Sequence, residues 1–565
     1  MADESTISRP QGQRPTAGVG RRTLDKAREA IEGAVYGTAL YRVSLRGKRP
    51  EALVFGPTDP WPGDDVQGAA LNDGAFTFAG QTVTAGTAVP WYPDGASTGW
   101  LEAMHGFHWL RHMAAAGGPE TRDRVHGLVT DWIEAQGDWH PLTWRADVLG
   151  CRLVAWLCHS SLLLSGAGRQ SAAAILTSLA EQARHLGRVA SAGPDGAARI
   201  TAVKGLVFAA LCLPGDDRRL AQALRLLERE MERQIRADGG HVSRSPSVQL
   251  AVLRDLVELR GVIMAGRQSV PTLLQTTIDR MAPIVRFFRH GDGGLALFND
   301  SNEGDPALIH VALALGDAPG QPPLSAPHSG FERLVARRAL VITDVGAPGP
   351  LAGPHAHGGT LSFEMSVDGH RLIVNCGAHG GSDPGWRQAQ RATAAHSTAA
   401  VEDADSVAVD LDGNLEHGPE RVVVTRLEDE GATWVDASHD GFVADFGISH
   451  RRRLYLAADG DSLRGEDTLS GRGRAGRFTI RFHLHPTVKA SLVADGTGAL
   501  LRLPGGEGWC MRSSGAMLVI ADSIYLGHSG GHAGAHSRSE QIVLSGPLKG
   551  GVTTVKWALS RIGGQ

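Results

Sequence analysis

One short stretch in the N-terminal half combines aromatic rings with a guanidinium group. Residues 139–145 read Trp-His-Pro-Leu-Thr-Trp-Arg, so Trp144 and Arg145 stand side by side in the chain. Aromatic faces stack on sugar rings, and arginine pairs with the carboxylates of uronic acids. The stretch therefore indicates a groove for an acidic glycan. The alternative is that the rings pack in the interior of a helical domain.

A second group of charged residues lies in the C-terminal half, where His450, Arg451, Arg452 and Arg453 follow one another. In a β-strand, successive side chains point to opposite faces. The run therefore predicts a strand whose alternate side chains face solvent. The competing interpretation is a contact with a polyanion.

The elements that would carry these residues change character along the chain. Between residues 97 and 290, apolar side chains recur with the period of an α-helix. Links rich in Gly and Pro, such as Gly117-Gly118-Pro119 and Gly193-Pro194, separate the helices. Short links between successive helices predict antiparallel hairpins. The first apolar face is Trp100, Met104, Phe107, Leu110 and Ala114, and the last is Leu274, Ile278, Met281 and Ile284.

After residue 335 the apolar period becomes two, which indicates β-strands. Leu361, Phe363, Met365 and Val367 alternate with polar residues. Asp-Gly pairs favour tight turns between such strands, and the pattern predicts an antiparallel sandwich. The predicted turns are Asp368-Gly369, Asp412-Gly413, Asp440-Gly441 and Asp459-Gly460. A stretch rich in Pro and Gly, residues 316–330, predicts the linker between the two halves.

Length and composition agree with two domains, because 565 residues exceed what one core supports. We expect a disordered terminus over 1–25, a lead-in segment over 26–95, a helical domain over 96–325 and a β domain over 335–565. The net charge of -4 gives no general attraction to nucleic acid, so we expect no such partner. The N-terminus has no apolar signal core and no apolar run reaches a membrane span, which predicts a cytoplasmic protein.

Several motifs, in order along the chain, resemble those of the heparinase II/III family, of the alphaproteobacterial type. The resemblance covers residues 90 to 565 and implies an α+β multidomain fold: an N-terminal incomplete α/α toroid followed by a C-terminal antiparallel β-sandwich. Cell envelope or periplasm is the compartment that the family suggests. The motifs are residues 238–246 (Asp-Gly-Gly-His-Val-Ser-Arg-Ser-Pro), 355–364 (His-Ala-His-Gly-Gly-Thr-Leu-Ser-Phe-Glu), 372–377 (Leu-Ile-Val-Asn-Cys-Gly), 391–398 (Arg-Ala-Thr-Ala-Ala-His-Ser-Thr), 439–442 (His-Asp-Gly-Phe) and 450–452 (His-Arg-Arg).

Enzymes of that family cleave uronate-containing polysaccharides by β-elimination, in a cleft between the two domains, with His and Tyr transferring the protons. The reaction needs a group that neutralises the uronate carboxylate, a base for the C5 proton and an acid for the leaving oxygen. By resemblance, His355 is the base or the carboxylate partner, since neutral histidine suits proton transfer. An ordinary loop histidine is the alternative.

The helical half departs from the family pattern, because Val248 stands where the family has a tyrosine after Ser-Pro. His241 or Arg244 could take over parts of the task, or could only cap and brace their segment. The family's Asn-His pair is replaced around Arg199, whose guanidinium can hold a carboxylate but cannot act as an acid at neutral pH. Trp144, Arg145 and Arg199 are thus the predicted substrate-binding residues.

A zinc site is the remaining implication of the resemblance. His357 and His396 match two ligand positions, and Asn375 stands where the family has an aspartate. An amide oxygen is a weaker ligand than a carboxylate, so zinc is an open alternative to a hydrogen-bonded polar cluster. The five cysteines include no Cys-x-x-Cys pair, so no disulfide framework or thiolate zinc site is indicated.

The leading hypothesis is therefore a lyase-like protein that acts on an acidic, uronate-containing polysaccharide or oligosaccharide by β-elimination. The alternative is a non-catalytic glycan-binding or envelope-associated protein that keeps the fold without the proton-transfer residues. A third possibility is a scaffold that contacts no glycan. No phosphate-binding loop and no His-Glu-x-x-His motif occurs in the sequence.

Overall fold

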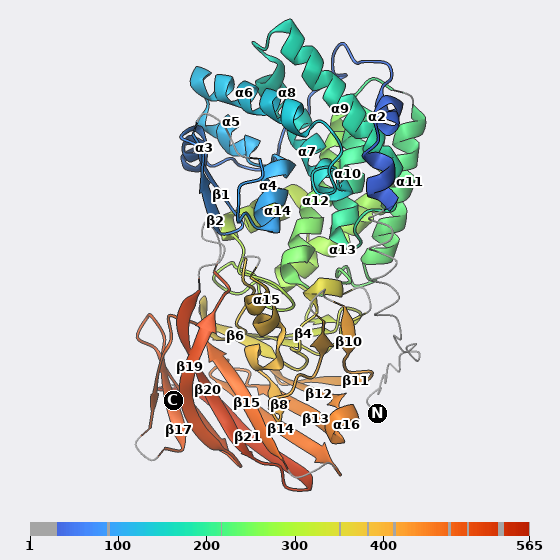
Figure 1. Ribbon diagram of the computed structural model, residues 1–565. Helices are drawn as coiled ribbons and strands as arrows, with labels where there is room; N and C mark the ends of the chain where they lie inside the picture. Colours follow the sequence, from blue (N-terminus) through green and yellow to red (C-terminus); the bar gives the residue numbers. More distant parts are fainter. Residues whose placement is uncertain are drawn as a thin grey trace.

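The structure is a computed structural model that describes residues 31–86, 91–215, 217–349, 352–380, 383–410, 414–472, 476–493, 496–528 and 536–563. The segment predicted to be disordered, 1–25, lies outside these residues. A helical half stands on a β half (Figure 1). The fold is α+β, as the sequence predicted. In the described part of the chain, no helix is long and apolar enough to cross a membrane.

The helical half begins with α2 (Ala39–Leu45), α3 (Asp65–Asn72) and a small hairpin, β1 (Ala75–Phe78) with β2 (Gln81–Thr84). Helices then follow one another, with longer links only at 235–245 and 288–305, and their apolar faces meet around buried rings such as Trp100, Trp132 and Trp156. They are α4 (Thr98–Gly106), α5 (Leu110–Ala116), α6 (Gly118–Gln136), α7 (Ala146–Cys158), α8 (Ser160–Leu164), α9 (Arg169–Val189), α10 (Ala197–Cys212), α11 (Asp217–Gln234), α12 (Pro246–Ala265), α13 (Thr272–Phe287) and α14 (Pro306–Gly316).

The β half contains two large antiparallel sheets. In the first, the strand order is β19-β20-β15-β7-β6-β5-β4-β3, and β8 also pairs with β15. Its strands are β3 (Ser325–Ala326), β4 (Phe331–Ala336), β5 (Ala339–Asp344), β6 (Phe363–Val367), β7 (His370–Val374), β8 (Ala399–Val401), β15 (Arg477–Leu484), β19 (Met517–Tyr525) and β20 (Ser537–Pro547).

The second sheet has the order β11-β12-β13-β14-β21-β18-β17-β16. Its strands are β11 (Val422–Asp429), β12 (Ala432–Phe442), β13 (Ile448–Leu456), β14 (Ser462–Gly471), β16 (Lys489–Leu492), β17 (Gly498–Arg502), β18 (Gly508–Ser514) and β21 (Gly551–Arg561). Shorter elements between the strands are the 3-10 turns η1 (Gly353–His355) and η2 (Thr393–Ala395), the helices α15 (Pro384–Arg391) and α16 (Val443–Phe446), and β9 (Ala408–Val409) with β10 (Leu415–His417).

The two sheets pack face to face through apolar side chains that alternate along each strand. Phe363 of the first sheet stacks on Trp557 of the second, with ring centroids 5.5 Å apart. The predicted strand through the arginine run is confirmed as β13, where Arg452 is buried while Arg451 and Arg453 are exposed. Arg452 pairs inside the sandwich with Asp467, so the middle arginine belongs to the core.

Two of the predicted Asp-Gly turns are confirmed and one is wrong. Asp368 and Gly369, both with positive φ, join β6 to β7, and Asp459-Gly460 joins β13 to β14. Asp440-Gly441 instead lies within β12, where the pairing register with β13 shifts between His439 and Phe442. A glycine fits there because a Cβ atom would lie 2.7 Å from the Ser406 carbonyl oxygen. Asp412-Gly413 lies outside the described residues.

Candidate functional site

A half-buried Asp-His pair joins the two halves of the protein. Asp300 lies in the segment between α13 and α14, and His355 ends η1 of the β half. The Asp300 Oδ2 and His355 Nδ1 atoms are 2.9 Å apart, and each side chain is 30% exposed. A carboxylate in this position fixes the ring orientation and keeps the proton on Nδ1. The Nε2 atom of His355 then carries the lone pair that can accept a proton from a ligand.

Backbone geometry and a neighbouring amide hold Asp300 in place. Asn299 and Asp300 have φ angles of 48° and 65°, in the left-handed region that non-glycine residues seldom adopt. Strain of this kind is retained where the surrounding structure imposes it, commonly at functional sites. The Gln390 side chain donates from Nε2 to Asp300 Oδ1 at 2.8 Å, while its Oε1 accepts from the His379 N–H.

The charges around Asp300 favour its ionised form. Burial would raise the pKa of this carboxyl, but the hydrogen bond and charge of His355, together with His357 and Arg391, bring its pKa below the usual value. Asp300 is therefore a carboxylate at neutral pH. An ionised partner stabilises an imidazolium that forms at His355 when the ring accepts a proton.

His357 and His396 lie behind this pair and contact each other. The His357 Nδ1 and His396 Nε2 atoms are 3.2 Å apart, and His396 Nδ1 donates to the Ala392 carbonyl oxygen. Burial holds the pKa of both rings below the ordinary value, to about 4 for His396. Both rings are thus neutral, and His357 Nε2 is a buried atom without a hydrogen-bond partner in the described chain.

Asn375 does not complete a zinc site with these histidines. Its Oδ1 accepts from the Ser397 N–H at 3.0 Å, and its amide nitrogen donates to Glu364 at 3.3 Å. The amide is therefore already used within the sheet. Among the residues that the structure describes, no group of three His, Cys, Asp or Glu side chains could hold a metal ion. The donor set therefore does not fit zinc.

His241 is close enough to His355 to experience its charge, but it is sealed off from solvent. The side chain is 2% exposed, and its ring nitrogens bond Ser243 Oγ at 2.8 Å and Gln234 Oε1 at 3.0 Å. Burial, with a smaller contribution from His355, lowers the pKa of His241 to about 3. This histidine therefore braces the segment before α12, which was the alternative that the sequence left open.

Arg244 forms a clamp between the two halves. Its Nε donates to the Ser329 carbonyl oxygen at 2.8 Å, and its guanidinium pairs with Asp344 and lies 4.7 Å above the Phe331 ring. The residue is 4% exposed and has a φ of 60°. Its Nη2 also donates to the Gly330 carbonyl oxygen, so the guanidinium has structural partners where the resemblance implied a catalytic role.

The three predicted substrate-binding residues do not join this cluster. Trp144 is 4% exposed and packs against His185, which favours the alternative of interior packing. Arg145 pairs with Asp147 and Glu102 at 2.7 and 2.8 Å. Arg199 donates to the Gly193 carbonyl oxygen, with Asp195 and Glu230 within 3.7 Å.

No tyrosine replaces the phenol that Val248 lacks. Val248 itself is partly buried against the helical core. The hydroxyl of Tyr525 donates to Glu303, and the Tyr92 hydroxyl lies 2.7 Å from His140 Nδ1. The other three, Tyr36, Tyr41 and Tyr455, pack against aromatic partners away from His355. Two partly exposed His–carboxylate pairs therefore join the halves in the described chain, His355 with Asp300 and His485 with Glu303, and the first has the shorter separation, 2.9 Å against 3.5 Å.

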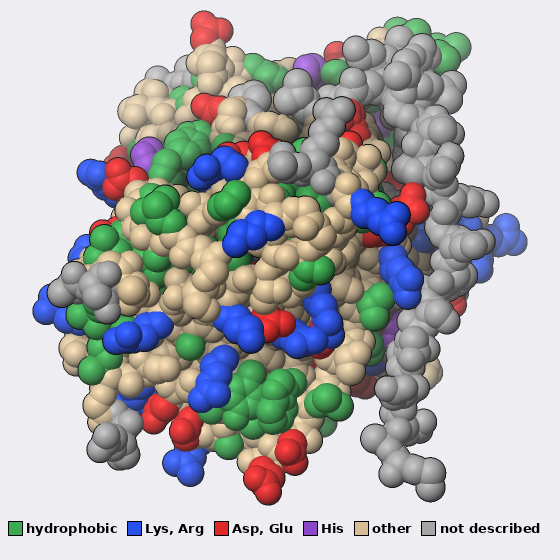
Figure 2. All heavy atoms as spheres, turned by 90° about the horizontal axis from the view of Figure 1, so that it is seen from below, with side chains coloured by type: hydrophobic (Ala, Val, Ile, Leu, Met, Phe, Trp, Pro, Cys, Tyr) green, Lys and Arg blue, Asp and Glu red, His purple; other side chains and the backbone are tan. Residues whose placement is uncertain are grey.

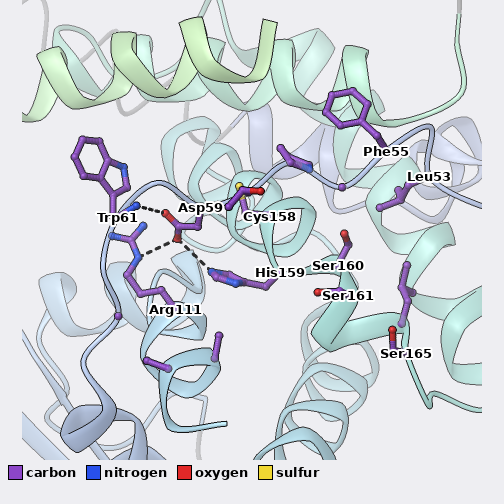
Figure 3. A pocket seen from close by; sticks show the side chains of 17 residues that line it. Leu53, Phe55, Asp59, Trp61, Arg111, Cys158, His159, Ser160, Ser161 and Ser165 are labelled. Atoms are coloured by element: carbon purple, nitrogen blue, oxygen red, sulfur yellow. Dashed lines mark hydrogen bonds and ion pairs between the residues drawn. The ribbon is translucent and has the colours of Figure 1, made fainter. Parts of the chain in front are cut away.

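A separate hollow of about 670 Å³ lies within the helical half (Figure 3). Asp59 stands at its floor, 3.2 Å from both Arg111 Nε and His159 Nε2. Although burial opposes it, these two partners lower the pKa of Asp59 to about 2. Ser160, Ser161 and Ser165 line the opposite wall. Because Asp59 is held by both neighbours, this group is a fixed ion cluster distinct from the His355 site.

Asp300 and Gln390 were not found from the sequence. Asp300 needs a left-handed backbone, and its contact with Gln390 joins residues 90 positions apart. No local sequence pattern reveals either feature. The only available signal was the Asn299-Asp300 pair, since Asn and Asp are the non-glycine residues that tolerate positive φ best.

Comparison with known proteins shows one family model, one curated relative and two solved structures that resemble this chain. The family model described as "Heparinase II/III-like, C-terminal" matches residues 318–558. The FtsZ-localized protein C of Caulobacter vibrioides is 32% identical over 555 residues, covering 94% of each chain. A crystal structure of heparinase III has a TM-score of 0.74 at 15% identity and covers 97% of this chain and 92% of its own. A mutant of heparan sulfate lyase HepC from Pedobacter heparinus follows, with a TM-score of 0.63 at 16% identity over 97% and 92% of the two chains.

Proposed function

This chain belongs to the heparinase II/III-like family, and we propose that it acts on an acidic, uronate-containing saccharide with His355 as its proton-transfer group. The observation that carries the proposal is the partly exposed His355–Asp300 pair, which joins the two halves across 2.9 Å. The lyase-like fold, a toroid over a sandwich, supports the same substrate class.

A single histidine can carry both proton transfers of a β-elimination. Its Nε2 removes the C5 proton of the uronate, the C–H electrons form the C4–C5 double bond, and the C4–O bond breaks. The leaving oxygen then needs a proton, and the imidazolium formed in the first step can supply it. Asp300 stabilises that imidazolium between the two steps.

The use of one histidine for both proton transfers predicts a stereochemical preference for the substrate. One group can serve both atoms only when the C5 hydrogen and the C4 oxygen lie on the same face of the sugar ring. Glucuronate and mannuronate meet this condition, whereas galacturonate and iduronate carry the two on opposite faces. We therefore expect action on glucuronate or mannuronate polymers and none on polygalacturonate.

The test follows the ultraviolet absorbance of the unsaturated uronate when purified protein meets heparosan, hyaluronan, polymannuronate and polygalacturonate. His355→Gln should abolish the signal, and Asp300→Asn should lower kcat by at least about a hundredfold while leaving KM little changed. His241→Gln is the matched control, since that ring is buried and should affect stability more than turnover. Binding of a polymer without product would support the non-catalytic alternative.

A second function rests on the relative from Caulobacter. Because identity of 32% extends over 94% of both chains, we propose that this protein too localises with FtsZ. Co-sedimentation of the purified protein with FtsZ polymers, and a fluorescent fusion in dividing cells, test the proposal. A protein that remains in the supernatant and is evenly distributed in cells would contradict it. The cytoplasmic location expected from the sequence stays a prediction.

A further inference from the structure

The outer face of the second sheet carries a groove that the proposed function does not use. The groove has a volume of about 490 Å³ and crosses the neighbouring strands β12, β13, β14, β21 and β18. Seen from below, the β half shows hydrophobic side chains with Lys and Arg, and some Asp and Glu, around them (Figure 2). The residues that matter most are Trp434, Arg453, Tyr455, Arg464, Arg512 and Lys556.

Strand alternation fixes which side chains reach this face. On β13, Arg453 and Tyr455 point outward while the buried Arg452 and Leu454 point into the core. The base of the groove is rigid, because Trp557 fills the inner face beneath Gly465. A Cβ atom on Gly465 would lie 2.0 Å from that indole ring. A fixed base and outward side chains make the groove a preformed surface.

Positive charge exceeds negative charge around the groove. Arg453 shares Asp436 with Arg451 and lies 3.3 Å from Glu466, which also faces Lys556 at 3.5 Å. Two further cations, Arg464 and Arg512, form no ion pair in the described part of the chain. The excess is local, because the whole chain has a net charge of -4.

An aromatic pair lies among these cations. Trp434 is 37% exposed, and its ring centroid is 4.5 Å from that of Tyr455. The Arg464 guanidinium lies 5.6 Å from the Tyr455 ring on the same face. Trp, Tyr and Arg are the residue types that dominate the binding energy of protein interfaces.

We propose that this groove is a docking surface for an acidic segment of a partner protein, with an apolar side chain of that segment against Trp434 and Tyr455. The cations would pair with Asp or Glu side chains, as arginine clusters do in other acidic-motif sites. Sugar hydroxyls need acceptors as well as donors, and the carboxylates at the groove, Asp436 and Glu466, already pair with cations. A peptide of carboxylates and apolar groups makes no such demand.

The size of the groove sets the length of the segment. Five neighbouring strands span four gaps of roughly 4.8 Å, or about 19 Å in total. An extended chain advances roughly 3.3 Å per residue, so about six residues lie across the groove. This inference is independent of the proposed function, since the groove and the His355 site share no residue.

The experiment uses fluorescence anisotropy of a labelled ten-residue peptide, rich in Asp and Glu with one Phe and one Leu, on the full-length protein. Arg464→Glu with Arg512→Glu, and separately Trp434→Ala, should each weaken binding at least about tenfold. Arg538→Glu is the matched control, because Arg538 is 81% exposed on β20 of the other sheet. Its affinity should stay within about twofold of wild type, and higher salt should weaken binding in wild type and control alike.

Thermal melting of each variant establishes that it is folded before its affinity is compared. Binding by the Arg464→Glu, Arg512→Glu protein as tight as by wild type would overturn the proposal. Failure of the wild type to bind the peptide at about 1 mM would do the same. So would heparin oligosaccharides or anionic vesicles that bind through Arg464 and Arg512 while the peptide does not.

Discussion

Replacing Arg244 by alanine tests whether this residue holds the two halves together. Arg244 joins the segment before α12 to Ser329, Phe331 and Asp344, all of which belong to the β half or the linker that enters it. The Asp344 side chain is 2% exposed, like that of Arg244. Removing the guanidinium therefore leaves a buried carboxylate whose remaining hydrogen bonds include that from the Gly346 N–H.

The size of the effect follows from that uncompensated charge. Removing one partner of a buried ion pair costs ~3–5 kcal/mol, and loss of the contact with the Phe331 ring adds to it. Burial raises the pKa of Asp344 even with Arg244 in place. Without Arg244 the carboxyl should take up a proton more readily, so the loss of stability should be smaller at pH 5 than at pH 8.

Urea unfolding of wild type, Arg244→Ala, Asp344→Asn and the double variant measures the coupling. We expect the double variant to be more stable than the sum of the single losses predicts, by about 2 kcal/mol or more. Arg145→Ala is the control, because the Arg145 side chain is 30% exposed and its loss should cost about 1 kcal/mol or less. A loss under about 1 kcal/mol for Arg244→Ala, together with abolished saccharide turnover, would refute the clamp and restore the catalytic role implied by the family.

Three further perturbations have expected outcomes. Lys204→Met should cost ~3–5 kcal/mol in urea unfolding, because Lys204 is 2% exposed and its loss leaves Asp255 and Glu258 uncompensated; a change near zero would contradict the pairing. Gly465→Ala should lower the melting temperature by several degrees, since its methyl group would overlap the Trp557 ring, whereas Gly127→Ala, where the added Cβ meets open space, should not. Acid should destabilise the protein as pH falls from about 6.5 toward 4, because buried histidine rings with a lowered pKa stay neutral in the folded state and gain a proton on unfolding. Each such ring should lower the free energy of unfolding by ~1.4 kcal/mol per pH unit. Calorimetry that finds no loss of stability between pH 7.5 and 5.5 would contradict this. The rings concerned are His105, His185, His241, His396 and His483, with pKa values of about 3, 4, 3, 4 and 3.

The architecture could be predicted from the sequence because it depends on local periodicity. Apolar residues at helical spacing between 97 and 290 lie on helices from α4 to α13, and alternation marks strands of both sheets. The face predicted from Trp100 to Ala114 is divided between α4 and α5, because Phe107 has a φ of 60° and ends α4. The failure at Asp440-Gly441 has a non-local cause. That pair also fits a bulge within a strand, and the choice is made by Ser406, which approaches from elsewhere in the sandwich.

The candidate site was less accessible to sequence reasoning. His355 was predicted as a proton-transfer group, and His357, Asn375 and His396 as metal ligands. The structure places His355 and His357 close to Asp300 and His396 against His357, whereas Asn375 bonds Ser397 and Glu364. The chemistry of each depends on burial and on its partners, which spacing does not report. Arg244 is a charged residue of the kind that binds a carboxylate, and it does so, but the carboxylate is Asp344 of the same chain.

His241 and Arg244 are both occupied by structural hydrogen bonds, so the proposed proton transfer depends on residues at the boundary between the two halves. Of the proposed proton-transfer pair, Asp300 belongs to the helical half and His355 to the β half, so their 2.9 Å separation depends on how the halves are docked. Arg244 maintains that docking from the segment before α12, and the Asn299 side chain donates to the Arg244 carbonyl oxygen at 3.1 Å. The guanidinium thus holds the backbone segment whose carbonyl oxygen anchors the left-handed Asn299-Asp300 turn. Loss of the guanidinium should therefore lower turnover by displacing Asp300 from His355, even though the guanidinium touches no substrate.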